Sequence, residues 1–156
     1  IKSYGGVRRR FEIKGVKNDI MIVDDYAHHP SEVKATLEAA KTGWKRRLVA
    51  VFQPHLYSRT KDFYLEFANE LMPADIIIIT DIYPAREKSI KGISGKLIYD
   101  AVKVNGHKNV YYKPNLNKLN SFLYKITKKK DLVITLGAGT IWRYGQDFYN
   151  SLPSND

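Results

Sequence analysis

The chain has 156 residues and no cysteine, with 44% hydrophobic and 27% charged residues, which predicts one folded domain, or at most two small ones, and excludes global disorder. The lack of cysteine excludes a disulfide scaffold, a cysteine-ligated zinc or iron–sulfur site and a thiol nucleophile. The formal net charge of +10 fits an anionic partner such as nucleic acid, a phosphorylated metabolite or an anionic membrane, and it equally fits a lysine-rich surface that serves solubility.

Short apolar runs rich in branched residues recur along the chain and predict buried strands. In chain order they are residues 20–23, 48–52, 76–79, 110–112 and 132–136. Most of these runs are continuous rather than alternating, which is typical of strands buried on both faces of a sheet. A further strand near residues 9–16 is expected at an edge or in a hairpin with residues 20–24, through a turn at 17–19.

Segments with helical spacing of apolar residues separate these strands. They are residues 30–42, 58–72, 94–104, 115–128 and 140–152. Pro30 suits the first turn of its helix, and Pro73 stops the next one. Because strands and helices alternate, the sequence predicts an α/β fold: a mostly parallel sheet of about six strands with helices on both faces.

The segments that follow four of the strands carry most of the chemistry-bearing side chains. They read D-D-Y-A-H-H-P at 24–30, Q-P-H-L-Y-S-R at 53–59, D-I-Y-P-A-R-E at 81–87 and G-A-G-T at 137–140. Three of the four histidines lie there, whereas the loops at the other strand ends are plain. Since ligands of open α/β sheets bind outside the carboxyl ends of the strands, we expect one site at this edge.

Each of these segments is open to more than one interpretation. Asp25, His28 and His29 could ligate a metal, cap the helix that begins at Pro30, or contact a ligand through a carboxylate and imidazoles. His55 and Arg59 lie one helical turn apart at a helix N-terminus, an arrangement that suits anion binding. They could equally be a capping histidine and an exposed arginine.

Glycine and arginine clusters leave similar alternatives. Gly137 and Gly139 permit close backbone approach to a ligand or serve only a tight turn. The Arg8-Arg9-Arg10 triplet could contact phosphate or ribose, or lie on a solvated strand edge. The chain has neither a complete dinucleotide fingerprint nor a P-loop motif. From the residues alone, we therefore predict an α/β domain with an anion-oriented site that is incomplete for catalysis.

The same segments, in the same order, resemble the C-terminal domain of the Mur ligases. The resemblance rests on G-V-R-R-R-F-E at 6–12, D-D-Y-A-H-H-P at 24–30, V-F-Q-P-H-L-Y-S-R-T at 51–60, D-I-Y-P-A-R-E at 81–87 and G-A-G at 137–139. It covers nearly the whole chain and is strongest to the branch that joins L-alanine to UDP-N-acetylmuramate in peptidoglycan precursor synthesis.

The resemblance implies a three-domain cytoplasmic bacterial ligase that uses ATP and Mg²⁺ and proceeds through an acyl phosphate. In such an enzyme an N-terminal domain binds the UDP-sugar, and a central domain carries the P-loop and most metal and phosphate ligands. We then expect residues 1–8 to be the tail of the central domain and a hinge, and residues 9–156 to be the amino-acid-binding domain. The chain lacks an initiator methionine, as a fragment would, and by itself it is expected to be inactive and to hold no metal.

The resemblance also assigns roles by position. His28, His55 and Arg59 are the expected catalytic residues, and they line the amino-acid pocket together with Tyr26, Gly137 and Gly139. Arg10 and Asp25, with Arg9 as a further candidate, are expected to bind the ATP ribose. Position 56 departs from the family pattern, because it holds Leu where relatives often have Arg, which places more of the anion binding on Arg59.

Two other functions remain open at this point. One is the related ligase that attaches a whole tripeptide to the same sugar, which shares the D-D-x-A-H-H-P run. The other is a noncatalytic, basic α/β domain that binds nucleic acid, for which the net charge is the only support.

Overall fold

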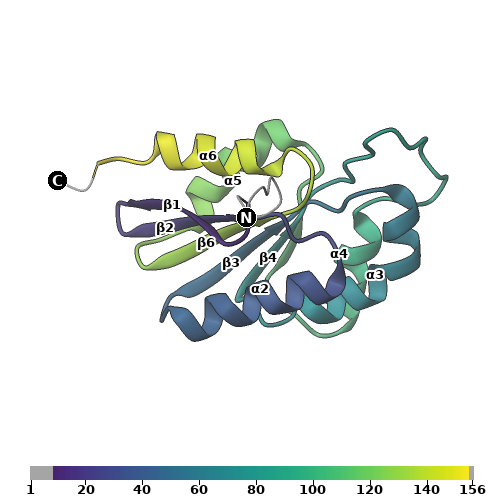
Figure 1. Cartoon of the computed structure of the whole chain (residues 1–156), viewed down its shortest axis with the longest axis horizontal. Helices are drawn as coiled ribbons and strands as arrows, with labels where there is room; N and C mark the ends of the chain where they lie inside the picture. Colours follow the sequence, from purple (N-terminus) through teal and green to yellow (C-terminus); the bar gives the residue numbers. More distant parts are fainter. Residues whose placement is uncertain (1–8, 155–156) are drawn as a thin grey trace, which may run out of the picture.

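The computed structural model describes residues 9–154, which build one six-stranded sheet between two layers of helices (Figure 1). The strands are β1 (Glu12–Lys17), β2 (Ile20–Asp25), β3 (Arg47–Phe52), β4 (Ile76–Ile79), β5 (Val110–Tyr112) and β6 (Asp131–Leu136). They lie in the order β1-β2-β6-β3-β4-β5, and every neighbouring pair is parallel except β1 and β2. The predicted fold class is confirmed, including the antiparallel hairpin at the edge.

The hairpin turn is built by residues that tolerate the left-handed backbone. Asn18 and Asp19 have φ values of 52° and 58°, and Lys17 pairs directly with Ile20. Two consecutive residues of this kind form the turn whose twist matches that of the flanking strands. The first strand begins at Glu12 rather than at the predicted position 9, because Phe11 has φ 45° and its N–H donates to the Asp25 side chain.

Three helices cover one face of the sheet and two cover the other. The first group is α2 (Pro30–Gly43), α3 (Tyr57–Leu71) and α4 (Lys96–Val104); the second is α5 (Leu119–Ile126) and α6 (Ile141–Ser151). Side chains alternate between the two cores along each strand, so that Ala50 packs toward the first group while Val49 and Val51 pack toward the second. Helices on both faces were predicted, and the structure confirms them.

One predicted helix is shorter than expected. The segment predicted at 115–128 is a 3-10 turn at Leu116–Lys118 followed by α5. The side chain of Asn115 accepts a hydrogen bond from the backbone N–H of Asn117 at 3.0 Å, which closes a local turn before the α-helix can begin.

The predicted hinge at residues 1–8 lies outside the described residues. Within residues 9–154, no helix is both long enough and apolar enough to cross a bilayer. Because β2, β3, β4 and β6 are parallel, their carboxyl ends open on one edge of the sheet. The four polar segments singled out from the sequence follow these four strands.

Candidate active site

Backbone hydrogen bonds continue past the strand ends and hold the four loops side by side. The N–H of Gln53 donates to the carbonyl of Leu136 at 3.0 Å, and the N–H of Gly137 donates to that of Asp25 at 3.1 Å. Thr80 N–H likewise donates to Phe52 at 3.0 Å. The loops therefore start from a rigid base, which is what a preorganised site requires.

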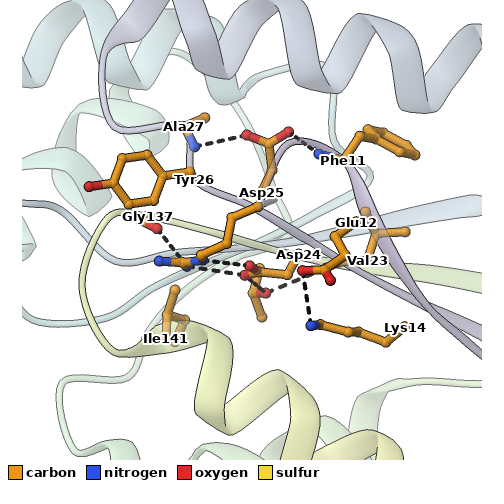
Figure 2. Close-up of polar contacts among 12 residues, drawn as sticks. Phe11, Glu12, Lys14, Val23, Asp24, Asp25, Tyr26, Ala27, Gly137 and Ile141 are labelled. Atoms are coloured by element: carbon orange, nitrogen blue, oxygen red, sulfur yellow. Dashed lines mark hydrogen bonds and ion pairs between the residues drawn. The ribbon is translucent and has the colours of Figure 1, made fainter. Parts of the chain in front are cut away.

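Asp25 points into the protein and anchors backbone on two sides (Figure 2). Its carboxylate oxygens accept hydrogen bonds from the N–H groups of Phe11 and Ala27, each at 2.8 Å. Burial raises the pKa of Asp25, and these backbone hydrogen bonds oppose that rise. In this conformation Asp25, which was predicted to bind the ATP ribose, connects the end of β2 to the segment that enters β1.

The side chain of Arg9 points into the same region and bonds to protein groups there. Its Nε lies 2.9 Å from the Asp24 carboxylate, and its Nη2 donates to the carbonyl of Gly137 at 2.9 Å. The guanidinium also lies over the ring of Tyr26, 5.1 Å from its centroid. Asp24 is buried and takes a further hydrogen bond of 2.7 Å from Thr135. The Arg9 guanidinium is therefore held by the Asp24 carboxylate and the Gly137 carbonyl.

Arg10 behaves differently from its neighbour. Its side chain is 48% exposed and makes one ion pair, with Glu32 at 3.2 Å. An exposed pair of this kind is weak and exchanges readily for another anion. Of Arg9 and Arg10, the two arginines before β1 that the structure describes, Arg10 is therefore the one available to an external ligand.

Glu32 organises the start of α2, and the sequence interpretation did not identify it. One carboxylate oxygen accepts from the backbone N–H groups of His28 at 3.0 Å and His29 at 3.1 Å. Burial tends to raise the pKa of Glu32, but these hydrogen bonds and the charge of His28 lower it overall. A Glu three residues after the helix N-cap is the signal of a capping box, so its spacing from His29 could have revealed it.

The metal interpretation gains no support from the residues that the structure describes. Among them, no group of three or more histidine, cysteine or acidic side chains is placed to hold a metal ion. Asp25 turns its oxygens to the backbone, while His29 serves as the N-cap residue of α2.

His28 projects from the loop after β2 toward the loop after β3. Its Nδ1 lies 2.8 Å from the carbonyl oxygen of Tyr26. The ring meets that of Tyr26 edge-on at 4.9 Å and that of His55 edge-on at 5.7 Å. Two histidines that are 27 positions apart in the chain therefore share one surface.

His55 is held between Arg59 and Tyr83. Its Nδ1 lies 3.0 Å from Nη1 of Arg59, one helical turn away in α3, and its ring stacks on that of Tyr83 at 5.9 Å. Burial, followed by the positive charge of Arg59, lowers the pKa of His55. Hydrogen bonds join the two loops around Leu56, whose N–H donates to the Tyr83 carbonyl at 2.9 Å and whose φ is 73°. Tyr83 is a second residue that the sequence interpretation missed.

Glu87 fixes the start of α3 from the loop after β4. It accepts a hydrogen bond of 3.1 Å from the N–H of Ser58 and another from the Ser58 hydroxyl. A carboxylate at a helix N-terminus satisfies free N–H groups and complements the helix dipole. Arg59 lies in this anchored first turn of α3, so its position depends on Glu87, which is nearly 30 residues further along the chain.

The two glycines after β6 lie against the same group. A Cβ on Gly137 would meet the backbone carbonyl of Gln53 at 2.9 Å, and one on Gly139 would meet Cγ of Tyr83 at 2.4 Å. Gln53 is buried and accepts a hydrogen bond from the N–H of Ile141 at 3.0 Å, which ties the loop after β3 to α6. Close approach of two loops therefore explains why both positions lack side chains.

The structure brings the predicted site residues to one edge in two groups. In the first group, the His28 ring contacts the His55 ring, and His55 contacts Arg59. Tyr26 lies beside His28, and Gly139 packs against Tyr83. Arg9, Arg10 and Asp25 form the second group next to β1. The first group offers imidazoles and a guanidinium, which can bind an anion and transfer a proton.

Comparison with known proteins places this arrangement in context. The family profile described as "Mur ligase, glutamate ligase domain" matches residues 9–139. The UDP-N-acetylmuramate–L-alanine ligase of Geotalea uraniireducens is 52% identical over 97% of the chain and 33% of its own length. The chain spans about a third of the length of the curated relatives it matches.

Solved structures agree with that match. The crystal structure of the UDP-N-acetylmuramate-alanine ligase from Thermotoga maritima superposes with a TM-score of 0.75 and 29% identity, covering 91% of this chain and 29% of that one. A murein peptide ligase from Psychrobacter arcticus also has a TM-score of 0.75, at 22% identity, over 95% of this chain and 30% of its own. The second likeness establishes the shared fold.

Proposed function

The chain belongs to the Mur ligase family, and we propose that it acts as the C-terminal domain of an ATP-dependent ligase that joins L-alanine to UDP-N-acetylmuramate. The proposed setting is peptidoglycan precursor synthesis in the bacterial cytoplasm. The L-alanine ligases among its relatives, one of them 52% identical over nearly the whole chain, support this choice within the family.

The observation that carries the proposal is the contact of His28, His55 and Arg59 at the ends of β2 and β3. In the proposed reaction the muramoyl carboxylate becomes an acyl phosphate, and the amine of L-alanine attacks it. Arg59 would hold a carboxylate or phosphate oxygen, and the imidazoles would orient the amine and assist loss of its proton. Holding the two reactants together in a closed site would supply most of the rate enhancement.

The second group of residues would face ATP. Arg10 has the exposed guanidinium that can reach a ribose hydroxyl or phosphate. Asp25 is buried, and both of its oxygens accept backbone hydrogen bonds, so its main contribution in this conformation is to support the backbone beside Arg10. Arg9 would act in the same indirect way through Asp24. Bound with ATP, Mg²⁺ would neutralise phosphate charge, with its ligands mostly on the central domain.

The proposal includes a division of the chain. Residues 1–8 would be the tail of the central domain and a hinge, and residues 9–156 would close over ATP once substrates bind. The chain alone would fold cooperatively and hydrolyse no ATP. A P-loop motif encoded upstream in the same reading frame would agree with this division.

The decisive assay uses the full-length enzyme with ATP, Mg²⁺ and UDP-N-acetylmuramate, and compares L-alanine with the tripeptide as acceptor. Preference for L-alanine is the expected result, and preference for the tripeptide would identify the related recycling ligase instead. Arg59→Ala should lower turnover on the order of 10²-fold or more through loss of a charge-assisted contact. Arg46→Ala is the matched control, because Arg46 pairs with Asp19 at the opposite edge of the sheet.

The nucleic-acid alternative has its own simple test. If the positive net charge serves to bind nucleic acid, a gel shift with random oligonucleotides would show strong, salt-dependent binding. We expect no shift at moderate salt.

A further inference from the structure

We propose that the two facing histidines have opposite tautomers and therefore opposite roles: His28 accepts the proton of the incoming amine at Nε2, and His55 only donates, from Nε2–H. The roles rest on the proposed ligase function, whereas the tautomers are a property of the chain itself. A neutral imidazole carries one N–H, and the partner of one ring nitrogen decides the state of the other.

His28 has its proton on Nδ1. The nearest partner of this nitrogen is the carbonyl oxygen of Tyr26 at 2.8 Å, and a carbonyl oxygen only accepts. A carboxylate oxygen of Glu32, also an acceptor, lies 3.5 Å from the same nitrogen. Both neighbours require an N–H at Nδ1, so the neutral ring has its lone pair at Nε2 and can take up a proton there.

His55 has the opposite arrangement. Its Nδ1 lies 3.0 Å from Nη1 of Arg59, and a guanidinium is always protonated and only donates. Nδ1 must therefore accept, which puts the single proton of the neutral ring on Nε2. Burial and the charge of Arg59 lower the pKa of His55, so the ring stays neutral near pH 7 and is a poor base.

The surroundings of the two rings reinforce the difference. Around His28 lie Tyr26, His29 and the Glu32 carboxylate, so an anionic oxygen lies 3.5 Å from the ring. Around His55 lie the Arg59 guanidinium and the Tyr83 ring; Arg59, His28 and His29 lower its pKa, and the charge of Glu87 opposes them. The ring centroids are 5.7 Å apart and the rings are nearly perpendicular, a separation that one small substrate can span.

These roles give a balanced step. L-alanine arrives as an ammonium, and His28 Nε2 takes one N–H proton, which frees the nitrogen lone pair to form the C–N bond. The acyl C–O bond to phosphate then breaks with its electron pair leaving on the phosphate, which takes the second N–H proton. The His28 imidazolium returns its proton to solvent. Throughout, the His55 N–H donates to an oxygen of the alanine carboxylate or of the acyl phosphate.

Ring nitrogen NMR of the ¹⁵N-labelled 156-residue chain tests the tautomers directly. His107 is an internal reference, because its Nε2 lies 2.7 Å from the Ala74 carbonyl and its Nδ1 accepts from the N–H of Asn109 at 3.1 Å. We expect His55 and His107 to share the Nε2–H pattern and His28 to show Nδ1–H. The same tautomer for His28 and His55 at neutral pH would overturn the proposal. Single His→Gln variants assign the signals.

Activity of the full-length ligase tests the roles, with hydroxylamine as a second acceptor. Hydroxylamine is already uncharged at neutral pH and needs no base. His28→Gln should therefore lose about 10²-fold or more with L-alanine and much less in hydroxamate formation. His55→Gln, whose amide N–H replaces the donor, should lose less than His55→Ala with either acceptor.

The outcomes separate the two hypotheses. Equal losses of His28→Gln with both acceptors would overturn the base role while leaving the ligase function intact. If the wild-type enzyme forms neither alanyl product nor hydroxamate, the proposed function fails, and the spectra still decide the tautomers. Folding of each variant is checked by the backbone spectrum, so that a loss caused by unfolding is recognised.

Discussion

Tyr83 and Gly139 approach so closely that a Cβ on the glycine would lie 2.4 Å from Cγ of the tyrosine ring. Tyr83 in turn stacks on His55, so Gly139 affects the position of the His55 ring, a proposed catalytic group, through Tyr83. Gly139→Ala should displace Tyr83 and lower kcat of the full-length ligase by about tenfold or more, since a shift near 1 Å is costly in a positioned site.

The control for this prediction is Gly43→Ala at the end of α2, where a Cβ would meet nothing within 4 Å. It should leave kcat unchanged. A Gly139→Ala enzyme with wild-type kcat would mean that Tyr83 does not position His55.

Of the adjacent arginines, Arg9 is expected to contribute to the stability of the fold and Arg10 to ligand binding. Arg9→Ala leaves the buried Asp24 carboxylate without its cation and should lower the free energy of unfolding by about 2–4 kcal/mol. Arg10→Ala removes an exposed pair and should lower it by less than about 1 kcal/mol.

In the full-length ligase, Arg10→Ala should instead raise the KM for ATP. Urea unfolding of the chain and ATP titration of the enzyme measure the two effects separately. Equal destabilisation by both variants would show that the interior role assigned to Arg9 is wrong.

Asp25→Asn tests whether this carboxylate is mainly an anchor. An amide has one acceptor oxygen, whereas Asp25 uses both oxygens to accept from Phe11 and Ala27, so an N–H would face an N–H. The free energy of unfolding should fall by about 1–3 kcal/mol. Asp100→Asn removes the same charge from an exposed pair with Lys96 and should cost less than about 1 kcal/mol. Wild-type stability of Asp25→Asn would contradict the anchoring role.

Most of the fold could be predicted from the sequence because its signals are local. Continuous branched runs such as Ile76–Ile79 mark buried strands, and Pro30 and Pro73 mark helix boundaries. The insertion of β6 between β2 and β3 could not be predicted, since it depends on packing between segments about 100 residues apart. The later start of α5 depends on a hydrogen bond that the Asn115 side chain accepts from the N–H of Asn117.

In the candidate site, too, some features could be predicted from the sequence and others depend on long-range contacts. The gathering of His28, His55 and Arg59 could be predicted, because the carboxyl ends of parallel strands share an edge. The inward orientation of Asp25 and the support from Tyr83 and Glu87 could not, since each depends on contacts between loops. The residues proposed to reach a ligand were therefore easier to predict than the residues that hold them in place.

The stability of the chain should fall as the pH drops below the ordinary histidine pKa of 6.5, and His55 should account for part of this fall. Burial and Arg59 lower the pKa of His55 in the folded state, so the unfolded chain takes up a proton first as the pH falls. The stabilising contribution is complete above pH 6.5 and is lost as the pH approaches the lowered value. The pKa of His29 is also lowered, chiefly by burial, and acts in the same direction.

Urea unfolding of the chain at several values between about pH 5 and pH 7.5 measures the slope of stability against pH. His55→Gln should reduce that slope, and adding His29→Gln should reduce it further. An unchanged slope in the double variant would mean that the pKa of neither ring is lowered in the folded chain. That result would also count against the hydrogen bond from Arg59 to the His55 ring, because a ring nitrogen that accepts from a guanidinium takes up a proton less readily than one in the unfolded chain.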